Sequence, residues 1–302
     1  MGNFRFIDLF AGIGGFHLAA SDNGGTCVFA SEIDSEAKKA YAENYGIEPA
    51  GDITQIAASD IPDHDMLCAG FPCQPFSIIG NRLGFDDIRG TLFFEIARII
   101  EQKKPPMLIL ENVKQLAGHD KKRTIAKIIE TLARLGYKTH WKVLNALDCG
   151  LPQKRERTVI VGFLDHKAEF SWPQKNPEYM PLANILEKNA DSKHYASDSI
   201  TLKRKERHTS NYAIAIWHEN KSGNVSSHPY SCALRAGASY NYLLVNGERR
   251  LTPREMLRLQ GFPESFKVVC SDMQTRKQAG NAVPVPMVRD VIKEVLRANS
   301  KA

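Results

Sequence analysis

One cysteine of the sequence stands in a short and stiff segment, GFPCQPFS, at residues 70–77. Pro72 and Pro75 enclose Cys73 and Gln74, and prolines this close together restrict the backbone on both sides of the thiol. A cysteine held in this way can be a buried core residue, a metal ligand, half of a disulfide or a nucleophile. The segment by itself leaves all four interpretations open.

The other five cysteines, at positions 27, 68, 149, 232 and 270, form no CxxC pair with it or with each other. Structural zinc sites commonly use such close pairs, so we do not expect zinc or any other metal. The opening residues, MGNFRFIDLF, lack the order of a secretory signal, and a disulfide framework is untypical of a large intracellular chain. We therefore expect a soluble, cytoplasmic protein whose cysteines are mostly buried.

A second group of residues could bind a nucleoside. The segment DLFAGIGG (8–15) places Gly12 and Gly14 between an expected strand and an expected helix, where ligands bind in open parallel sheets. Glu32 follows Gly12 by 20 residues, a spacing at which a carboxylate can bind both ribose hydroxyls. Asp52 in GDIT could accept hydrogen bonds from an adenine amine. A tight turn without a ligand is the alternative.

The same segment argues against a nicotinamide dinucleotide. Its glycines do not follow the GxGxxG spacing, and no basic residue is placed to face a pyrophosphate. This favours a nucleoside cofactor without phosphates, such as S-adenosylmethionine.

The elements that must position these groups alternate along the first half of the chain. Continuous apolar runs predict strands, and amphipathic spacing predicts helices between them. The expected strands are 4–10, 26–33, 66–70, 107–112, 138–145 and 158–163; the expected helices are 35–45, 91–102, 121–136 and 283–299. Ser35 is the expected N-cap of the first of these helices. The pattern predicts an α/β fold with a parallel or mostly parallel sheet covered on both faces.

The composition of the sequence changes after about residue 165. The stretch 166–245 is polar, its elements are hard to assign, and it contains the basic run LKRKERH (202–208). Residues 1–118 hold 9 Lys and Arg against 16 Asp and Glu, whereas the remaining 184 residues hold 31 against 18. This asymmetry favours contact between the later part and a polyanion. At 250–263, Thr252, Pro253 and Glu255 predict the N-cap, N1 and N3 of a helix.

Eight blocks of the sequence together resemble the DNA (cytosine-5) methyltransferases, especially the compact bacterial enzymes of restriction–modification systems. The blocks are FIDLFAGIGG (6–15), SEID (31–34), GDIT (51–54), GFPCQPFS (70–77), ENV (111–113), QKRERTVIVGF (153–163), RLTPREMLRLQGFP (250–263) and QAGNAVPVPM (278–287). The resemblance implies a Rossmann-like catalytic and S-adenosylmethionine-binding domain of residues 1–185 and 278–302. A smaller, irregular target-recognition domain would span residues 186–277.

The resemblance also implies which residues carry out the reaction. Cys73 would add to C6 of a cytosine flipped out of duplex DNA. Glu111 would hold or protonate N3, which requires a carboxyl group that burial keeps protonated. Arg157 would contact O2, and Arg155 would contact a phosphate or orient the site.

For the cofactor, the resemblance implies a larger set of contacts, namely Phe10, Gly12, Gly14, Glu32, Ile33, Asp52, Ile53, Pro72, Leu92, Asn281 and Val283. Ser77 and Arg89 would contact the DNA backbone from a segment, 77–90, that glycines allow to close over the DNA. Arg235 would contact a guanine or a phosphate. The family usually has a Thr-Leu pair where this chain has Ala233-Leu234, so the resemblance assigns no contact to that position.

Double-stranded DNA is thus the expected partner, with a cognate restriction endonuclease in the same system and a monomer as the expected state. Three alternatives are less well supported. An enzyme of the same fold that methylates tRNA cytosine is disfavoured by the long polar segment with its basic run 202–208. A nucleic-acid-binding relative without activity is disfavoured by the intact set of Cys73, Glu111 and Arg157, and a nicotinamide dehydrogenase by the glycine spacing.

Overall fold

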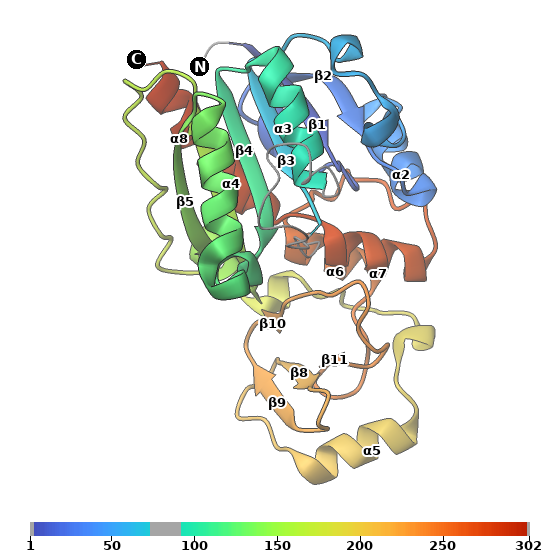
Figure 1. The fold of residues 1–302 in the computed structure, drawn as a ribbon. Coiled ribbons are helices and arrows are strands. Elements are labelled where there is room, and N and C mark those ends of the chain that lie inside the picture. Colours follow the sequence, from blue (N-terminus) through green and yellow to red (C-terminus); the bar gives the residue numbers. More distant parts are fainter. Residues whose placement is uncertain (1–2, 73–91, 301–302) are drawn as a thin grey trace. The chain divides into compact units, whose positions relative to one another are not determined.

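The structure, a computed structural model, describes residues 3–72 and 92–300 (Figure 1). Backbone contacts divide the chain into a first unit, Met1–Leu144, Glu156–Gln174 and Met287–Ala302, and a second unit, Asn145–Arg155 and Lys175–Pro286. These bounds differ from the expected division at 185 and 278. Residues 145–155 join the second unit because strand β6 (Gln153–Lys154) pairs with β10 (Ser231–Cys232) there.

A six-stranded sheet forms the centre of the first unit, in the order β2-β1-β3-β4-β7-β5. Its strands are β1 (Phe4–Leu9), β2 (Gly25–Ser31), β3 (Met66–Gly70), β4 (Met107–Val113), β5 (Lys138–Asn145) and β7 (Glu156–Phe163). Strands β2, β1, β3 and β4 run parallel, and β7 pairs antiparallel with β4. The prediction of a mostly parallel, Rossmann-like α/β fold is confirmed, with a mixed sheet.

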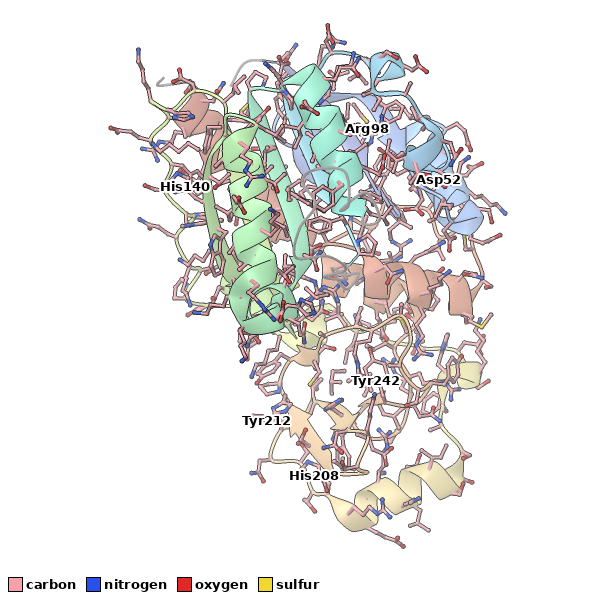
Figure 2. All side chains as sticks on the ribbon, in the orientation of Figure 1. Asp52, Arg98, His140, His208, Tyr212 and Tyr242 are labelled. Carbon is pink, nitrogen blue, oxygen red and sulfur yellow. The ribbon has the colours of Figure 1, made fainter. Side chains whose placement is uncertain are left out.

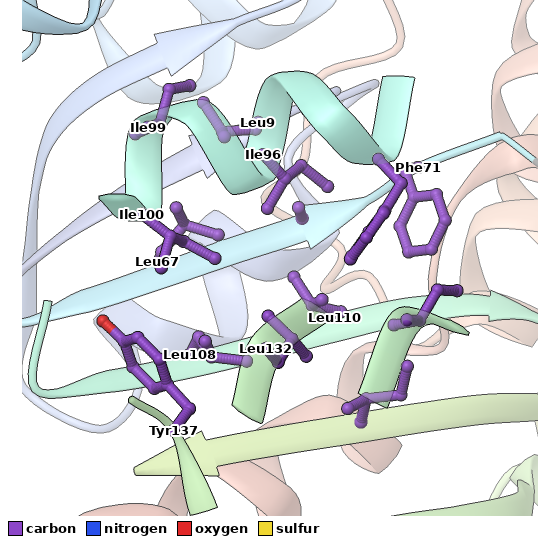
Figure 3. Packing of buried hydrophobic residues seen from close by; sticks show 14 of the residues in the cluster. Leu9, Leu67, Phe71, Ile96, Ile99, Ile100, Leu108, Leu110, Leu132 and Tyr137 are labelled. Atoms are coloured by element: carbon purple, nitrogen blue, oxygen red, sulfur yellow. The ribbon is translucent and has the colours of Figure 1, made fainter. Parts of the chain in front are cut away.

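Helices cover both faces of this sheet (Figure 1). They are α1 (Gly15–Ser21), α2 (Ser35–Tyr45), α3 (Leu92–Lys103), α4 (Arg123–Arg134) and α8 (Val285–Asn299). On one face, α3 and α4 pack against alternate residues of the strands, for example Ile96 and Leu132 beside Leu67 and Leu108 (Figure 3). Burial of this apolar surface is the main force that holds the layers together. Helix α8 lies behind the sheet in Figure 1 and buries its apolar stripe.

Helix α2 begins differently from the prediction. Ser35 is already helical, and Asp34 is the N-cap, because its carboxylate accepts hydrogen bonds from the backbone N–H groups of Glu36 and Ala37. The strand before it ends at Ser31, so Glu32 and Ile33 lie in the connection between β2 and α2.

The second unit has short elements around its own apolar cluster. Strand β8 (Ile216–Glu219) pairs antiparallel with β9 (Val225–His228) and with β11 (Leu243–Val245). Its helices are α5 (Asp198–Arg207), α6 (Pro253–Gln260) and α7 (Asp272–Asn281). Thr252 and Glu255 form the predicted capping box of α6, with Pro253 at its first position.

Short 3-10 turns complete both units, at Ile53–Gln55, Ala58–Asp60, Lys114–Ala117, His119–Lys122, Ala146–Cys149, Leu182–Asn184 and Ser192–His194. Within residues 3–72 and 92–300, no helix combines the length and the apolar character that crossing a membrane requires.

The packing between the sheet and α3 gives a stability prediction. Leu67 is fully buried, so Leu67→Ala should lower the free energy of unfolding by about 2–5 kcal/mol. Leu202 on α5 is 60% exposed, and Leu202→Ala should change it by less than about 0.5 kcal/mol. Urea unfolding followed by circular dichroism measures both values; equal midpoints for the two variants would contradict the packing described above.

Candidate functional site

The glycine-rich turn after β1 has an unusual backbone. Phe10, Gly12 and Gly14 all have positive φ angles, of 56°, 56° and 80°. For phenylalanine this is a rare conformation that costs free energy, and such residues concentrate at functional sites. A Cβ atom at Gly12 would meet nothing within 4 Å, whereas one at Gly14 would collide with the ring of Tyr45. The turn is therefore open at Gly12 and closely backed at Gly14.

Glu32 holds this turn to the end of β2. One carboxylate oxygen, Oε2, accepts a hydrogen bond from the backbone N–H of Gly12 at 2.8 Å. The other, Oε1, accepts from the N–H groups of Ile33 and Asp34, both at 2.8 Å. Three of about four acceptor positions are thus occupied by backbone groups. Glu32 is expected to bind both ribose hydroxyls. Because Oε1 already accepts two hydrogen bonds, those hydroxyls would have to bind at Oε2.

A layer of aromatic side chains backs the turn. The Tyr45 hydroxyl donates to the carbonyl oxygens of Gly14 at 2.9 Å and Ile13 at 3.3 Å. The ring of His17 stacks on the Tyr45 ring with centroids 4.0 Å apart, and its Nδ1 is 2.6 Å from the Tyr41 hydroxyl. Burial lowers the pKa of His17 to about 4, so this layer contains a neutral imidazole at neutral pH.

Asp52 and Ile53 lie on a separate loop before β3. Asp52 caps the 3-10 turn through Oδ1, which accepts from the N–H of Thr54 at 2.9 Å; Oδ2 is bonded to none of the described residues. Arg98 of α3 donates to the carbonyl oxygens of Ile53 and Ile56, at 3.2 and 2.9 Å, and so holds the loop (Asp52 and Arg98 are labelled in Figure 2). One carboxylate oxygen is left to bind a ligand.

The register of β3 and β4 determines where the Pro-Cys-Gln segment starts. Gly70, the last residue of β3, lies beside Glu111 of β4. The side chain of Asn112 donates from Nδ2 to the carbonyl oxygen of Phe71 at 2.9 Å, in a buried position. Pro72 follows and is exposed. Cys73, Ser77 and Arg89 lie outside the described residues.

Glu111 and Arg157 form a buried ion pair at the ends of β4 and β7. Nε of Arg157 is 2.9 Å from Oε1 of Glu111, and their side chains are 12% and 9% exposed. Burial lowers the pKa of Arg157, and the neighbouring Glu111 opposes that shift. The opposite charges of a carboxylate and a guanidinium attract each other strongly at this distance. The pair joins two residues that the sequence placed 46 positions apart.

Arg155 belongs to the second unit and is 1% exposed. Its guanidinium donates to the carbonyl oxygens of Leu234, Gly280 and Ala282, at 2.7–2.9 Å. A phosphate contact, one of its two expected roles, does not fit this burial. Arg155 instead fixes the backbone around Leu234 and the end of α7.

The remaining predicted residues are scattered over both units. Leu92 begins α3 in the first unit and is half-buried. Asn281 ends α7 in the second unit and is exposed, whereas Val283 is buried there. Arg235 is an exposed residue of the second unit.

Four residues that fix the backbone beside predicted residues within their own units were missed by the sequence analysis: Tyr45, Arg98, Asn112 and Gln153. Gln153 is fully buried and bonds the backbone of Leu234 and Leu259 through its side chain. Asn112 and Gln153 lie inside the sequence blocks that resemble the family, and this could have marked them. Tyr45 and Arg98 lie outside those blocks, and no sequence pattern marks them. No group of three or more His, Cys, Asp and Glu side chains that could hold a metal ion occurs in the described part of the chain.

Comparison with solved structures shows the fold. The S. pombe Dnmt2 methyltransferase superimposes with a TM-score of 0.75 at 22% identity, covering 98% of this chain and 99% of that one. A variant of the Spodoptera frugiperda DNMT2 gives a TM-score of 0.77 at 20% identity, covering 97% and 99%.

Comparison of sequences gives much closer relatives. The type II methyltransferase M.NgoBI of Neisseria gonorrhoeae is 55% identical over 288 residues, which cover 94% of this chain and 90% of that protein. M.HaeII of Haemophilus aegyptius is 52% identical over 305 residues, covering 100% and 96%. The C-5 cytosine-specific DNA methylases match residues 4–297. Each match includes nearly the whole chain. The chain therefore belongs to the C-5 cytosine-specific DNA methylase family.

Proposed function

We propose that this DNA (cytosine-5)-methyltransferase is the modification enzyme of a type II restriction–modification system, and that Cys73 is its nucleophile. The observation that supports the site most directly is the buried Glu111–Arg157 pair, because Glu111 is level with Gly70, three residues before Cys73. The close relatives named above are type II methyltransferases, which supports the biological setting. A bacterial cytoplasm, with a cognate endonuclease acting on the same sequence, fits this role.

The reaction begins on a cytosine flipped out of the duplex, since the stacked base cannot be reached. The thiolate of Cys73 adds to C6 and forms an S–C6 bond, which makes C5 nucleophilic. Bound S-adenosylmethionine would supply the methyl group that this nucleophilic C5 accepts. Loss of the C5 proton to water or hydroxide and cleavage of the S–C6 bond release 5-methylcytosine and the thiolate.

Glu111 and Arg157 act on the other edge of the base. As Cys73 adds, negative charge develops at N3 and O2, and a carboxyl proton at N3 and a guanidinium at O2 stabilise it. Because Arg157 favours the carboxylate form of Glu111, we infer that Glu111 takes up a proton when cytosine replaces part of the ion pair. The Asn112 bond to Phe71 keeps the adjacent backbone in position for Cys73.

S-adenosylmethionine is the methyl donor of the family, and its sulfonium makes the methyl group transferable. The described residues fit this cofactor: Gly12 leaves open space, Oε2 of Glu32 faces the turn, Oδ2 of Asp52 is available, and Ile33 offers an apolar side chain that is 73% exposed. We assign the ribose to Glu32 and the adenine to Asp52, Ile53 and Ile33. Phe10, Gly14, Pro72, Leu92, Asn281 and Val283 remain predicted contacts.

Target recognition is assigned to the second unit, with Ser77, Arg89 and Arg235 as predicted DNA contacts. The first experiment incubates the enzyme and labelled S-adenosylmethionine with duplex DNA or with tRNA. We expect label in the DNA, and bisulfite sequencing of a methylated plasmid then identifies the recognition sequence. Label in tRNA alone would contradict the proposed substrate.

The covalent step predicts a trapped complex. Duplex DNA with 5-fluorocytosine at the target should remain bound to the enzyme through denaturing electrophoresis, because no proton can leave C5. Cys73→Ser should form no such complex and should lose methyl transfer while it still binds S-adenosylmethionine. A Cys73→Ser enzyme with full activity would exclude Cys73 as the nucleophile.

The Glu111–Arg157 pair predicts losses in turnover. Glu111→Gln keeps a hydrogen-bond donor but cannot transfer a proton, so kcat should fall about 10²–10⁴-fold. Arg157→Lys keeps the charge and loses the planar fork, and it should also lower kcat. Dissociation constants for S-adenosylmethionine, measured by calorimetry, should stay within about twofold of wild type, because neither residue lies at the glycine turn. Unchanged kcat in both variants would exclude the pair from the reaction.

The aromatic layer predicts a specific effect on the cofactor. Tyr45→Phe removes the hydroxyl bonded to Gly14 and Ile13, so it should weaken S-adenosylmethionine binding by about 5–10-fold, the cost of one buried hydrogen bond. Tyr41→Phe is the matched control, because its hydroxyl is bonded to His17 and not to the turn. Equal dissociation constants for the two variants would show that the Tyr45 hydroxyl does not shape the turn.

A further inference from the structure

Three arginines and two tyrosines of the second unit stack in an alternating order, here called the Arg–Tyr cluster. The guanidinium carbon of Arg235 lies 4.8 Å from the centre of the Tyr242 ring, and that of Arg276 lies 5.7 Å from it. Arg276 is also 5.2 Å, and Arg250 4.6 Å, from the centre of the Tyr240 ring. Cations placed over aromatic faces in this way are attracted by the ring quadrupole. Tyr242 is labelled in Figure 2.

The positive charge of the cluster is not compensated within the described residues. None of its three arginines has a carboxylate oxygen within 4 Å there. Other arginines of the same unit do have such partners, in the pairs Arg204–Glu219, Arg249–Glu255 and Arg258–Glu264. Three neighbouring guanidinium groups repel one another unless an anion binds near them. The cluster is therefore suited to an anionic ligand.

The same residues fix the loop 235–242 in one shape. Arg276 donates to the carbonyl oxygens of Ala238 and Ser239, both at 2.7 Å. Arg250 donates to Oδ1 of Asn241 at 3.0 Å, and the N–H of Arg235 donates to the Tyr242 hydroxyl at 2.9 Å. Much of the hydrogen-bonding capacity of Arg250 and Arg276 is spent on the protein itself. They contribute charge and position, and Arg235 is the exposed guanidinium that can reach a ligand.

The ligand has to bind on the surface of the cluster. The cavity enclosed by these side chains holds only about 10 Å³, which is no more than one water molecule needs. Tyr240 is 50% exposed and Arg235 is exposed as well. A small molecule has no pocket here, whereas an extended polyanion can lie across the exposed side.

We propose that the Arg–Tyr cluster is a preformed phosphate-binding surface for the backbone of duplex DNA, with Arg235 as the contact and Arg250 and Arg276 as positioning residues. The inference rests on the DNA-methylating function of the chain. A phosphate fits better than a base edge, because three neighbouring cations combine their charges and so favour a charged partner, whereas a base edge carries no net charge. The cluster thus determines the affinity for DNA and the position of the DNA on the protein, and it does not determine which base sequence is recognised.

The test is the salt dependence of DNA binding, measured by fluorescence anisotropy in the presence of S-adenosylmethionine between about 50 and 200 mM salt. Two duplexes are compared, one with the methylation sequence found by bisulfite sequencing and one without it. Arg235→Gln should weaken binding to both duplexes by a similar factor. It should also reduce the slope of log K against log salt by about 0.9, the value of one phosphate contact.

Two matched variants sharpen the result. Arg258→Gln removes the same charge from a guanidinium that Glu264 already pairs in two hydrogen bonds, so it should leave the slope unchanged. Arg235→Lys keeps a point charge and should restore most of the binding and the slope, as a phosphate contact allows and a bidentate guanine contact does not. Arg276→Gln should weaken the binding of both duplexes, and it should speed amide hydrogen exchange in the loop 235–242.

Two results would overturn the proposal. If Arg235→Gln affects only the duplex with the methylation sequence, and Arg235→Lys does not restore binding, Arg235 reads a base. If Arg235→Gln changes neither affinity nor slope, the cluster only stabilises its loop. Methyl transfer by the wild-type enzyme to duplex DNA is measured on the same preparation, so a failure of the function itself is seen separately.

Discussion

Strand β4 fixes the relative positions of the groups at the candidate active site. It is bonded in parallel to β3 on one side and antiparallel to β7 on the other. This register places Glu111 beside Gly70, and it places Val113 beside Arg157. A slip of one residue would turn each side chain of β4 to the opposite face of the sheet. The ion pair between Glu111 and Arg157, and the bond from Asn112 to Phe71, both depend on this pairing.

Around that strand, the site is shaped by side chains that bond to backbone atoms of other segments. Glu32 binds three backbone N–H groups, Tyr45 binds two carbonyl oxygens at the glycine turn, and Arg98 binds two on the loop of Asp52. Such hydrogen bonds hold loops that make too few apolar contacts to be ordered by packing alone. They also leave the few atoms that face a ligand, such as Oδ2 of Asp52, in defined places.

The sequence predicted the fold and the residues of the site well. It predicted the geometry of the site less well. Strand β3 is a continuous apolar run and β5 is a mixed segment, and both 66–70 and 138–145 were predicted with their observed bounds. The site residues came from recognised blocks and not from periodicity. Arg155 shows the limit: the resemblance implied a phosphate contact or a role in orienting the site, and the buried guanidinium, bonded to three carbonyl oxygens, fits only the second role. Every residue has a carbonyl group, so no sequence pattern marks such partners, and Tyr45 escaped notice for the same reason.

The bonds of Arg155 have a consequence for the order in which the protein can be made. They join residue 155 to carbonyl groups at 234, 280 and 282, and the first unit takes its last helix from residues beyond 286. Domains generally fold as units as the chain leaves the ribosome. Here Arg155 lacks its partners until residue 282 has emerged, and the first unit lacks part of its core until the residues after 286 have emerged. The strands β1 to β4 are therefore synthesised well before α8, the helix that completes the cover of their sheet.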